Sequence, residues 1–417
     1  MRRPRLAALA SAVLAVATMA ALTTPASAAP PSRDSRLWVN PASSTLQAAD
    51  SLTGAALTNA LTLAAYPSAT WFTGGTPDEV RQQVGAVVVQ ADVAGQVPVL
   101  VAYNLPYRDC GRYSTGGATG VVAYQAWIDG FARGIGNSAA IVILEPDGLA
   151  AIPWYSAADG TEQDCRPDGS NRATAAAERF AALNHAVEAL TALPSAKVYL
   201  DGGHSNWLGV GDLSERLIKA GVLRAAGFFL NAGDYQYTAN LRAYGRWVSS
   251  CITWVVTARG DPDECGDQRW NGGPSTNWVG AAMNAYGQWS QDNPAFALDT
   301  AGVDSRYVQQ LAGRTPLVHF VIDTSRNGAG PWEVSSGYEG WCNPPDRGLG
   351  LRPTLNVDDP LVDAYLWIAN PGTSDGACLR GDPGPLDPAR NRVDPPAGEW
   401  FPEMARELLA NAVPPVR

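Results

Sequence analysis

The chain has 417 residues, of which 46% are hydrophobic, so it is long enough to bury a sizeable core. Its formal net charge of −10 argues against nucleic acid or an anionic membrane surface as a partner, and a neutral substrate fits better. Fourteen tryptophans are many for this length. Flat indole faces suit the apolar faces of sugar rings, although any single tryptophan is more often part of the core.

The N-terminal residues are typical of a secretory signal. Arg2, Arg3 and Arg5 precede an apolar run over residues 6–22, and Ala26-Ser27-Ala28 has the pattern of a cleavage site. The run is shorter than the roughly 20 residues of a membrane span, which makes a retained anchor the weaker alternative. We therefore predict a signal peptide at residues 1–28 and a secreted, extracellular protein of residues 29–417, with no membrane partner.

Six cysteines in an exported chain predict disulfide bonds, but sequence alone leaves 15 pairings open. No Cys-x-x-Cys or His-x-x-x-His spacing is present and there are only three histidines. A zinc site is therefore not expected, and nothing implies an organic cofactor.

Apolar runs bounded by turn residues alternate with helical patterns, which is typical of an α/β fold with a parallel sheet. The predicted strands are Ala69–Phe72, Val97–Tyr103, Ala139–Leu144, Ala196–Leu200, Gly227–Leu230, Leu317–Ile322 and Ala364–Ile368. The predicted helices are Pro77–Ala94, Val121–Gly134, Arg172–Leu193, Tyr237–Trp247 and Glu399–Leu409. No linker or internal repeat interrupts the pattern, so residues 29–417 are expected to form a single catalytic domain.

Acidic residues follow four of the predicted strands, at Asp109, Asp147, Asp201 and Asp323. In a parallel barrel the carboxyl ends of the strands meet at one mouth, where active sites lie. One such aspartate alone could equally be a helix N-cap. Four together, two of them beside arginines, favour a site.

Carboxylates that converge on a neutral polysaccharide suggest hydrolysis of a glycosidic bond, for which one carboxyl must stay protonated and another ionised. Asp147 follows Pro146 and an apolar strand, the drier setting expected of the general acid. Arg108 and Arg326 are candidates for holding a second carboxylate ionised.

Two strings, VAYNLPYRDC at residues 101–110 and IVILEPDGL at residues 141–149, resemble the two signatures of glycoside hydrolase family 6. Further blocks resemble the same family in the same order: VYLDGGHSNW, HFVIDTSRNG, WCNPP, DAYLWI and PGTSDG. The likeness runs from about Trp71 to Trp400, which is nearly the whole of the chain after the predicted signal peptide. It implies a distorted parallel β/α barrel of about seven strands, with an active site that hydrolyses β-1,4-glucan with inversion.

The resemblance also implies roles for single residues. Asp147 matches the family's general acid, and Asp375 matches the residue proposed as base. Asp109 matches the aspartate that raises the acid's pKa and positions water, with Arg108 and Arg326 as its charge partners. Tyr103 matches a tyrosine that contacts the distorted sugar ring in the family. The family's sugar-binding positions match Trp71, Asp201, His204, Trp207, Asn231 and Trp341. The family's disulfides would be Cys110–Cys165 and Cys342–Cys378, which leaves Cys251–Cys265 as an additional bridge.

Three positions depart from the family pattern. Ala369 and Thr373 stand where a lysine and a glutamate commonly bind sugar hydroxyls on the non-reducing side of the cleavage point, and Gly148 stands where a larger residue is usual. A carbohydrate-binding module is not expected. Long segments at residues 375–400 and 251–293 favour a roofed cleft and chain-end action, with internal cleavage as the alternative.

Two rival hypotheses assign the chain to other classes of protein, a serine hydrolase or a glucan-binding protein without catalysis. Ser205 follows a strand as in a serine hydrolase, but Trp207 stands where the nucleophile turn needs a small residue. A glucan-binding protein without catalysis would explain Ala369 and Thr373, but the acids of the site are all present. The sequence therefore predicts a monomeric cellulase that takes a β-glucan polysaccharide.

Overall fold

The computed structural model describes residues 28–157, 160–272, 283–290, 299–333 and 339–416. The predicted signal peptide therefore lies outside the described residues except for Ala28. Seven parallel strands form one sheet whose spatial order is their chain order. They are β1 (Thr70–Phe72), β2 (Val99–Ala102), β3 (Ala140–Leu144), β4 (Ala196–Asp201), β5 (Gly227–Leu230), β6 (His319–Asp323) and β7 (Val362–Leu366).

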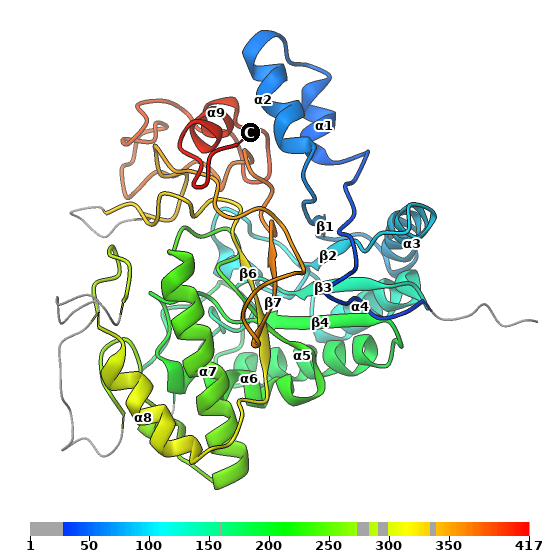
Figure 1. The fold of residues 1–417 in the computed structure, drawn as a ribbon. Helices are drawn as coiled ribbons and strands as arrows, with labels where there is room; N and C mark the ends of the chain where they lie inside the picture. The colour runs from blue at the N-terminus through cyan, green and yellow to red at the C-terminus, as the bar shows by residue number, and fades with distance from the viewer. Residues whose placement is uncertain (1–27, 158–159, 273–282, 291–298, 334–338, 417) are drawn as a thin grey trace, which may run out of the picture.

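The sheet curls into a distorted β/α barrel with helices around it, which confirms the predicted fold (Figure 1). Among the described strands, no ladder joins β1 to β7. Two hydrogen bonds cross this gap instead, from the Ala69 amide to the Trp367 carbonyl at 2.9 Å and from the Trp71 indole to the Ile368 carbonyl at 2.8 Å. The carboxyl ends of all seven strands thus surround one mouth.

The helices that were predicted are α3 (Pro77–Val93), α4 (Val121–Ile135), α5 (Ala175–Thr191), α7 (Thr238–Ala258) and α9 (Pro402–Ala410). Those missed are α1 (Ser44–Ala49), α2 (Gly54–Ala64), α6 (Val210–Lys219) and α8 (Ala301–Leu311). None of the missed helices exceeds 11 residues, so each offers few repeats of a helical apolar pattern. Three short 3₁₀ turns are η1 (Asp109–Gly111), η2 (Val222–Arg224) and η3 (Pro262–Glu264).

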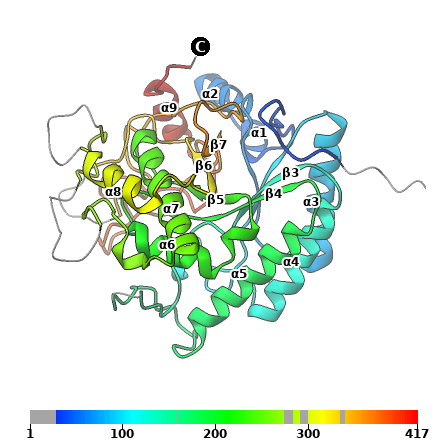
Figure 2. The ribbon, with the colours of Figure 1, turned by 60° about the horizontal axis from the view of Figure 1, so that its bottom comes forward.

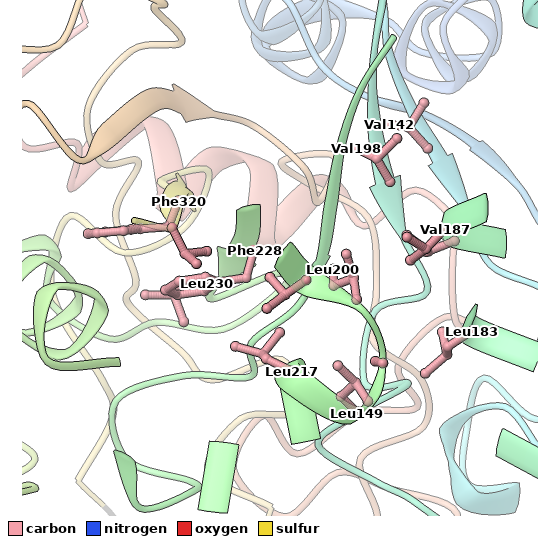
Figure 3. Close-up of a cluster of buried hydrophobic side chains, with 14 of the residues drawn as sticks. Val142, Leu149, Leu183, Val187, Val198, Leu200, Leu217, Phe228, Leu230 and Phe320 are labelled. Atoms are coloured by element: carbon pink, nitrogen blue, oxygen red, sulfur yellow. The ribbon is translucent and has the colours of Figure 1, made fainter. Parts of the chain in front are cut away.

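Alternate residues of each strand enter two different cores. Val142, Val198 and Phe228 face outward and pack with the surrounding helices, as the close-up in Figure 3 shows for this cluster. Val101 and Ile143 face inward and fill the barrel. Because both faces of the sheet are covered, strands such as β2 and β3 are apolar at every position rather than alternating.

Helix α2, near the start of the described residues, packs against the C-terminal helix α9 beside the mouth of the barrel. Leu63 of α2 shares a third apolar cluster with Trp367, Phe401 and Leu408, and both views of the fold place α2 beside α9 (Figure 2). This contact brings the N-terminal segment to the edge of the site, where no sequence motif had placed it.

The disulfides are Cys110–Cys165, Cys251–Cys265 and Cys342–Cys378, which is the pairing implied by the family resemblance. Among the described residues, no helix combines the length and the apolar character that a membrane crossing requires.

Helices α3 and α4 approach closely at Gly130, where an added Cβ would lie 2.2 Å from the carbonyl oxygen of Pro77. We expect Gly130→Ala to lower the free energy of unfolding by about 1–3 kcal/mol, because the two backbones must separate. Urea unfolding followed by circular dichroism measures this. Gly74→Ala is the control, since its Cβ would meet nothing within 4 Å. Equal midpoints for the two variants would contradict the close contact.

Candidate active site

Two adjoining hollows occupy the mouth of the barrel. One, the His204 hollow, has a volume of about 390 Å³, and the other, the Trp71 hollow, about 640 Å³. Asp109, Asp147 and Trp341 line both hollows and therefore stand at their junction. The structure thus brings two of the predicted catalytic carboxyl groups together between two spaces large enough for sugar rings.

Asp147 lies in the loop after β3, in a left-handed backbone conformation with φ of 61°. Burial raises the pKa of the Asp147 carboxyl well above its ordinary value, and the negative charges of Asp201, Asp109 and Asp234 raise it further. Asp147 therefore holds its proton at pH values where an ordinary aspartate has lost it. A general acid needs this property.

The carboxylate of Asp201 holds the loop that carries Asp147. Asp201 accepts the Leu149 and Ala150 amides at 3.0 and 2.9 Å on one oxygen and the Gly203 amide at 3.0 Å on the other. Such charge-assisted bonds to backbone N–H groups are among the stronger hydrogen bonds in proteins. The position of Asp147 is therefore set by a side chain from the neighbouring strand.

Glu145 ties the loops after β2 and β3 together and was not among the predicted site residues. Its carboxyl group accepts the Asn104 amide at 2.9 Å and the Leu105 amide at 3.0 Å. Burial raises the pKa of Glu145 to about 7 despite these bonds. Gly148 permits the tight turn, because a Cβ there would lie 2.7 Å from the Glu145 carbonyl oxygen, which explains its departure from the family pattern.

Asp109 accepts the Ser114 amide at 2.7 Å, and its burial raises the pKa of its carboxyl group. The charge of Arg108, predicted as a partner, lowers the pKa of Asp109 and so opposes the effect of burial, although no direct ion pair joins the two side chains. The Arg108 guanidinium instead donates to main-chain carbonyls, among them those of Tyr103 and Thr73 at 2.8 Å, and lies 4.8 Å from the centre of the Tyr103 ring. Arg108 therefore holds the loop and the tyrosine.

Arg326 pairs with Asp375, at 2.8 Å, so the expectation that it pairs with Asp109 is wrong. The reason is topological: Arg326 follows β6 and Asp375 follows β7, the adjacent strand, whereas Asp109 follows β2. Asn343 completes the arrangement by donating its amide to Asp375 at 3.0 Å and accepting the Asp375 amide at 2.8 Å.

Most of the predicted sugar-binding side chains line the hollows: Trp71, Tyr103, Asp201, His204, Trp207 and Trp341. Trp71 and Tyr103 meet edge to face at 5.3 Å. Asn231 differs, since it lines neither hollow. Its side chain is buried and bonds main-chain groups of Asp234, Asp323 and Gln236, so it shapes the loop.

The Asp323 carboxylate also accepts hydrogen bonds from backbone amides. It accepts the amides of Ser325, Gly233 and Ala369 at 2.8, 3.1 and 2.9 Å and is buried beneath the site. Two of the four acids that follow strands, Asp201 and Asp323, are thus occupied with loop amides. Neither is the N-cap of a helix, so the capping alternative is wrong for both, and Asp201 lines the His204 hollow together with Asp109 and Asp147.

Asp234 is a fourth carboxylate of the His204 hollow that the sequence analysis missed. Its Oδ2 lies 3.3 Å from His204 Nε2, and His204 Nδ1 accepts the Asn206 amide at 3.2 Å. Both ring nitrogens are therefore engaged within the protein. The signal was available, because Asp234 follows β5 as the other acids follow their strands.

One group of possible metal ligands occurs among the described residues, formed by Cys378, Asp387 and Asp394. Cys378 is in a disulfide bond and Asp387 pairs with Arg380 at 2.8 Å. The donor set therefore does not fit a metal ion, since neither a free thiolate nor an unpaired Asp387 is on offer.

A family model described as "Glycosyl hydrolases family 6" matches residues 32–412. This chain belongs to glycosyl hydrolases family 6. Among its family 6 relatives, endoglucanase A of Thermobispora bispora is 32% identical over 85% of this chain and 57% of its own length. Endoglucanase 1 of Streptomyces sp. (strain KSM-9) is 33% identical over 83% of this chain and 70% of its own length. The chain thus spans only about half to two thirds of these relatives.

Solved structures agree with the assignment to family 6. The endoglucanase Cel6 from Mycobacterium tuberculosis, in complex with a thio-linked methyl cellobiosyl cellobioside, has a TM-score of 0.62 and 32% identity. The match covers 90% of this chain and 97% of that one. Cellobiohydrolase II of Humicola insolens, at 22% identity and a TM-score of 0.61, shares the fold.

We expect Asp234→Asn to lower the pKa of Asp147, because it removes one of the negative charges that raise it. Carbon-13 NMR of labelled aspartate carboxyl groups measures the titration, with the signal assigned through Asp147→Asn. Asp129→Asn is the matched control, since it removes the carboxylate from a histidine–aspartate pair of 2.8 Å at the surface. An unchanged Asp147 titration in Asp234→Asn would contradict the electrostatic role.

Proposed function

We propose that this chain is a secreted β-1,4-glucanase that cleaves with inversion, with Asp147 as the general acid. The observation that carries the proposal is a carboxyl group with a strongly raised pKa at the junction of two sugar-sized hollows. Family membership and the names of its relatives, endoglucanases and cellobiohydrolases, support the substrate class. The three disulfides support export.

Asp375 and Asp109 are candidates for activating and orienting the attacking water. In an inverting hydrolase a second carboxylate activates water on the face of the ring opposite the acid. Asp375, paired with Arg326 and held by Asn343, is the candidate for this role. Asp109 lines both hollows, raises the pKa of Asp147 by its charge, and is placed to orient water.

The Trp71 hollow would take the non-reducing part of the glucan. Ala369 and Thr373 line it and offer no charge, and the Thr373 hydroxyl already donates to the Asn370 carbonyl at 2.8 Å. Polar side chains of the N-terminal segment line the same hollow, namely Asn40, Ser43, Ser44 and Gln47. These groups are suited to bind sugar hydroxyls in place of the family's lysine and glutamate.

Asp147→Asn is expected to lower kcat on carboxymethylcellulose by at least about 10²–10⁴-fold, since it removes the proton donor. Asp363→Asn, which removes the carboxylate of the His319–Asp363 pair at 2.8 Å, is the matched control and keeps activity. Released product should be the α-anomer when followed by proton NMR. A wild-type protein that binds glucan without hydrolysing it would support the non-catalytic alternative.

Chain-end action is the mode that the loops support best. The Tyr113 hydroxyl, on the loop after β2, donates to Glu339 at 3.0 Å and accepts the Leu379 amide at 2.9 Å from the segment after β7. Tyr113 lines the Trp71 hollow. Contact between loops from these two strands favours a covered cleft at that end, and a covered cleft admits chain ends more readily than chain interiors.

We expect the wild type to release cellobiose from carboxymethylcellulose or swollen cellulose with little loss of viscosity per bond cleaved. Tyr113→Phe removes the hydroxyl that joins the loops and should increase the viscosity loss per reducing end formed. Tyr107→Phe serves as the control, because its hydroxyl donates to the Gly169 carbonyl, outside this contact. A rapid viscosity drop with the wild type would instead establish internal cleavage.

A further inference from the structure

The segment between α7 and α8 contributes one described residue, Tyr286, to the lining of the His204 hollow. Its longer described parts are residues 259–272 and 283–290, and the Cys251–Cys265 disulfide joins the first of them to α7. Gln268 is buried and donates to the carbonyls of Ser205 and Leu208 at 2.7 and 3.1 Å. The segment is therefore fastened to the loop that carries His204 and Trp207.

The second described part is a turn with its own anchors. The buried side chain of Asn240 on α7 donates to the Gly287 carbonyl at 3.0 Å and accepts the Trp289 amide at 2.8 Å. Trp289 stacks on Trp247 with ring centres 5.5 Å apart and donates to the Asn284 carbonyl at 3.0 Å. A turn held at both ends in this way presents its tip in a defined place.

Tyr286 stands at the tip of this turn. Its amide bonds the Asn284 side chain at 2.9 Å, and its own side chain lines the His204 hollow together with Trp207 and Trp332. With 36% of its surface accessible, it is the only exposed aromatic residue among those that the structure describes. Tyr286 is thus an accessible aromatic ring on an anchored turn, beside two tryptophans that line the same hollow.

We propose that Tyr286 forms a sugar-binding site at the outer part of the His204 hollow, where its ring stacks on a glucose unit distant from the cleavage point on the leaving-group side. This inference rests on the proposed function. A tyrosine suits the task because its ring offers an apolar face to the C–H groups of a pyranose while its hydroxyl stays hydrated. Asp147 lies at the inner end of the same hollow, where it borders the Trp71 hollow.

Such a site makes a chain-length prediction. A long cello-oligosaccharide reaches Tyr286 and a short one does not, so the contact binds ground state and transition state of the long substrate equally. Losing it should raise KM and leave kcat unchanged. We therefore expect Tyr286→Ala to raise KM for cellohexaose by about 3–10-fold, the range of one aromatic contact. Values of KM and kcat for cellotetraose should stay as in the wild type.

Three further variants make the test decisive. Tyr286→Phe and Tyr286→Trp keep a stacking face and should restore the wild-type KM for cellohexaose. Leu223→Ala is the matched control, since it truncates an exposed apolar side chain on η2, at the amino-terminal end of β5 and away from the mouth. Kinetics are followed by chromatography of the released sugars with the full-length secreted protein.

The outcomes separate this inference from the proposed function. Hydrolysis of both oligosaccharides by the wild type establishes the glucanase, whatever Tyr286 does. Equal effects of Tyr286→Ala on the two substrates, or no effect on either, would overturn the distal site. Failure of Tyr286→Phe to restore KM would show that the ring face is not the binding element.

Discussion

The structure depends on a buried set of carboxyl groups that bind the backbone amides of the loops above the barrel. Parallel strands end together, and the loops that leave them carry N–H groups with no partner in the sheet. Asp201, Glu145 and Asp323 supply those partners from the strand ends themselves. Each carboxyl group fastens a loop other than its own, so the loops around the mouth form one connected layer.

The same clustering of carboxyl groups also shifts their pKa values. Carboxylates crowded at one edge raise each other's pKa, and burial adds to the effect. Asp147, surrounded by Asp201, Asp109 and Asp234, keeps its proton, whereas Asp375 has Arg326 beside it. Two carboxyl groups with opposite surroundings are what acid and base roles require. The carboxyl groups that accept loop amides and the carboxyl group with the strongly raised pKa are thus neighbours on the same edge.

The two sides of the junction are built differently. The Trp71 hollow is bounded by the ends of the chain, since α1 and the segment after β7 both line it. The His204 hollow is bounded by the segment between α7 and α8, fastened through Gln268 and Asn240. Elements outside the repeating strand–helix pattern therefore shape both hollows, and they are the parts in which differences of substrate and of cleavage mode are expected to lie.

The sequence by itself determined the strands, their parallel order and the carboxylates that follow them, because a buried strand and the turn after it are local patterns. It identified Asp109, Asp147 and Asp375 through motifs that match a known family. The tertiary structure alone decided partners and boundaries: that Arg326 meets Asp375, that Asn231 lies under the loop, and that Asp234 joins His204. It also brought Tyr286 to the hollow. These contacts join residues of different strands or segments, and their geometry follows from how the barrel curls and how its loops are fastened, which no local pattern records.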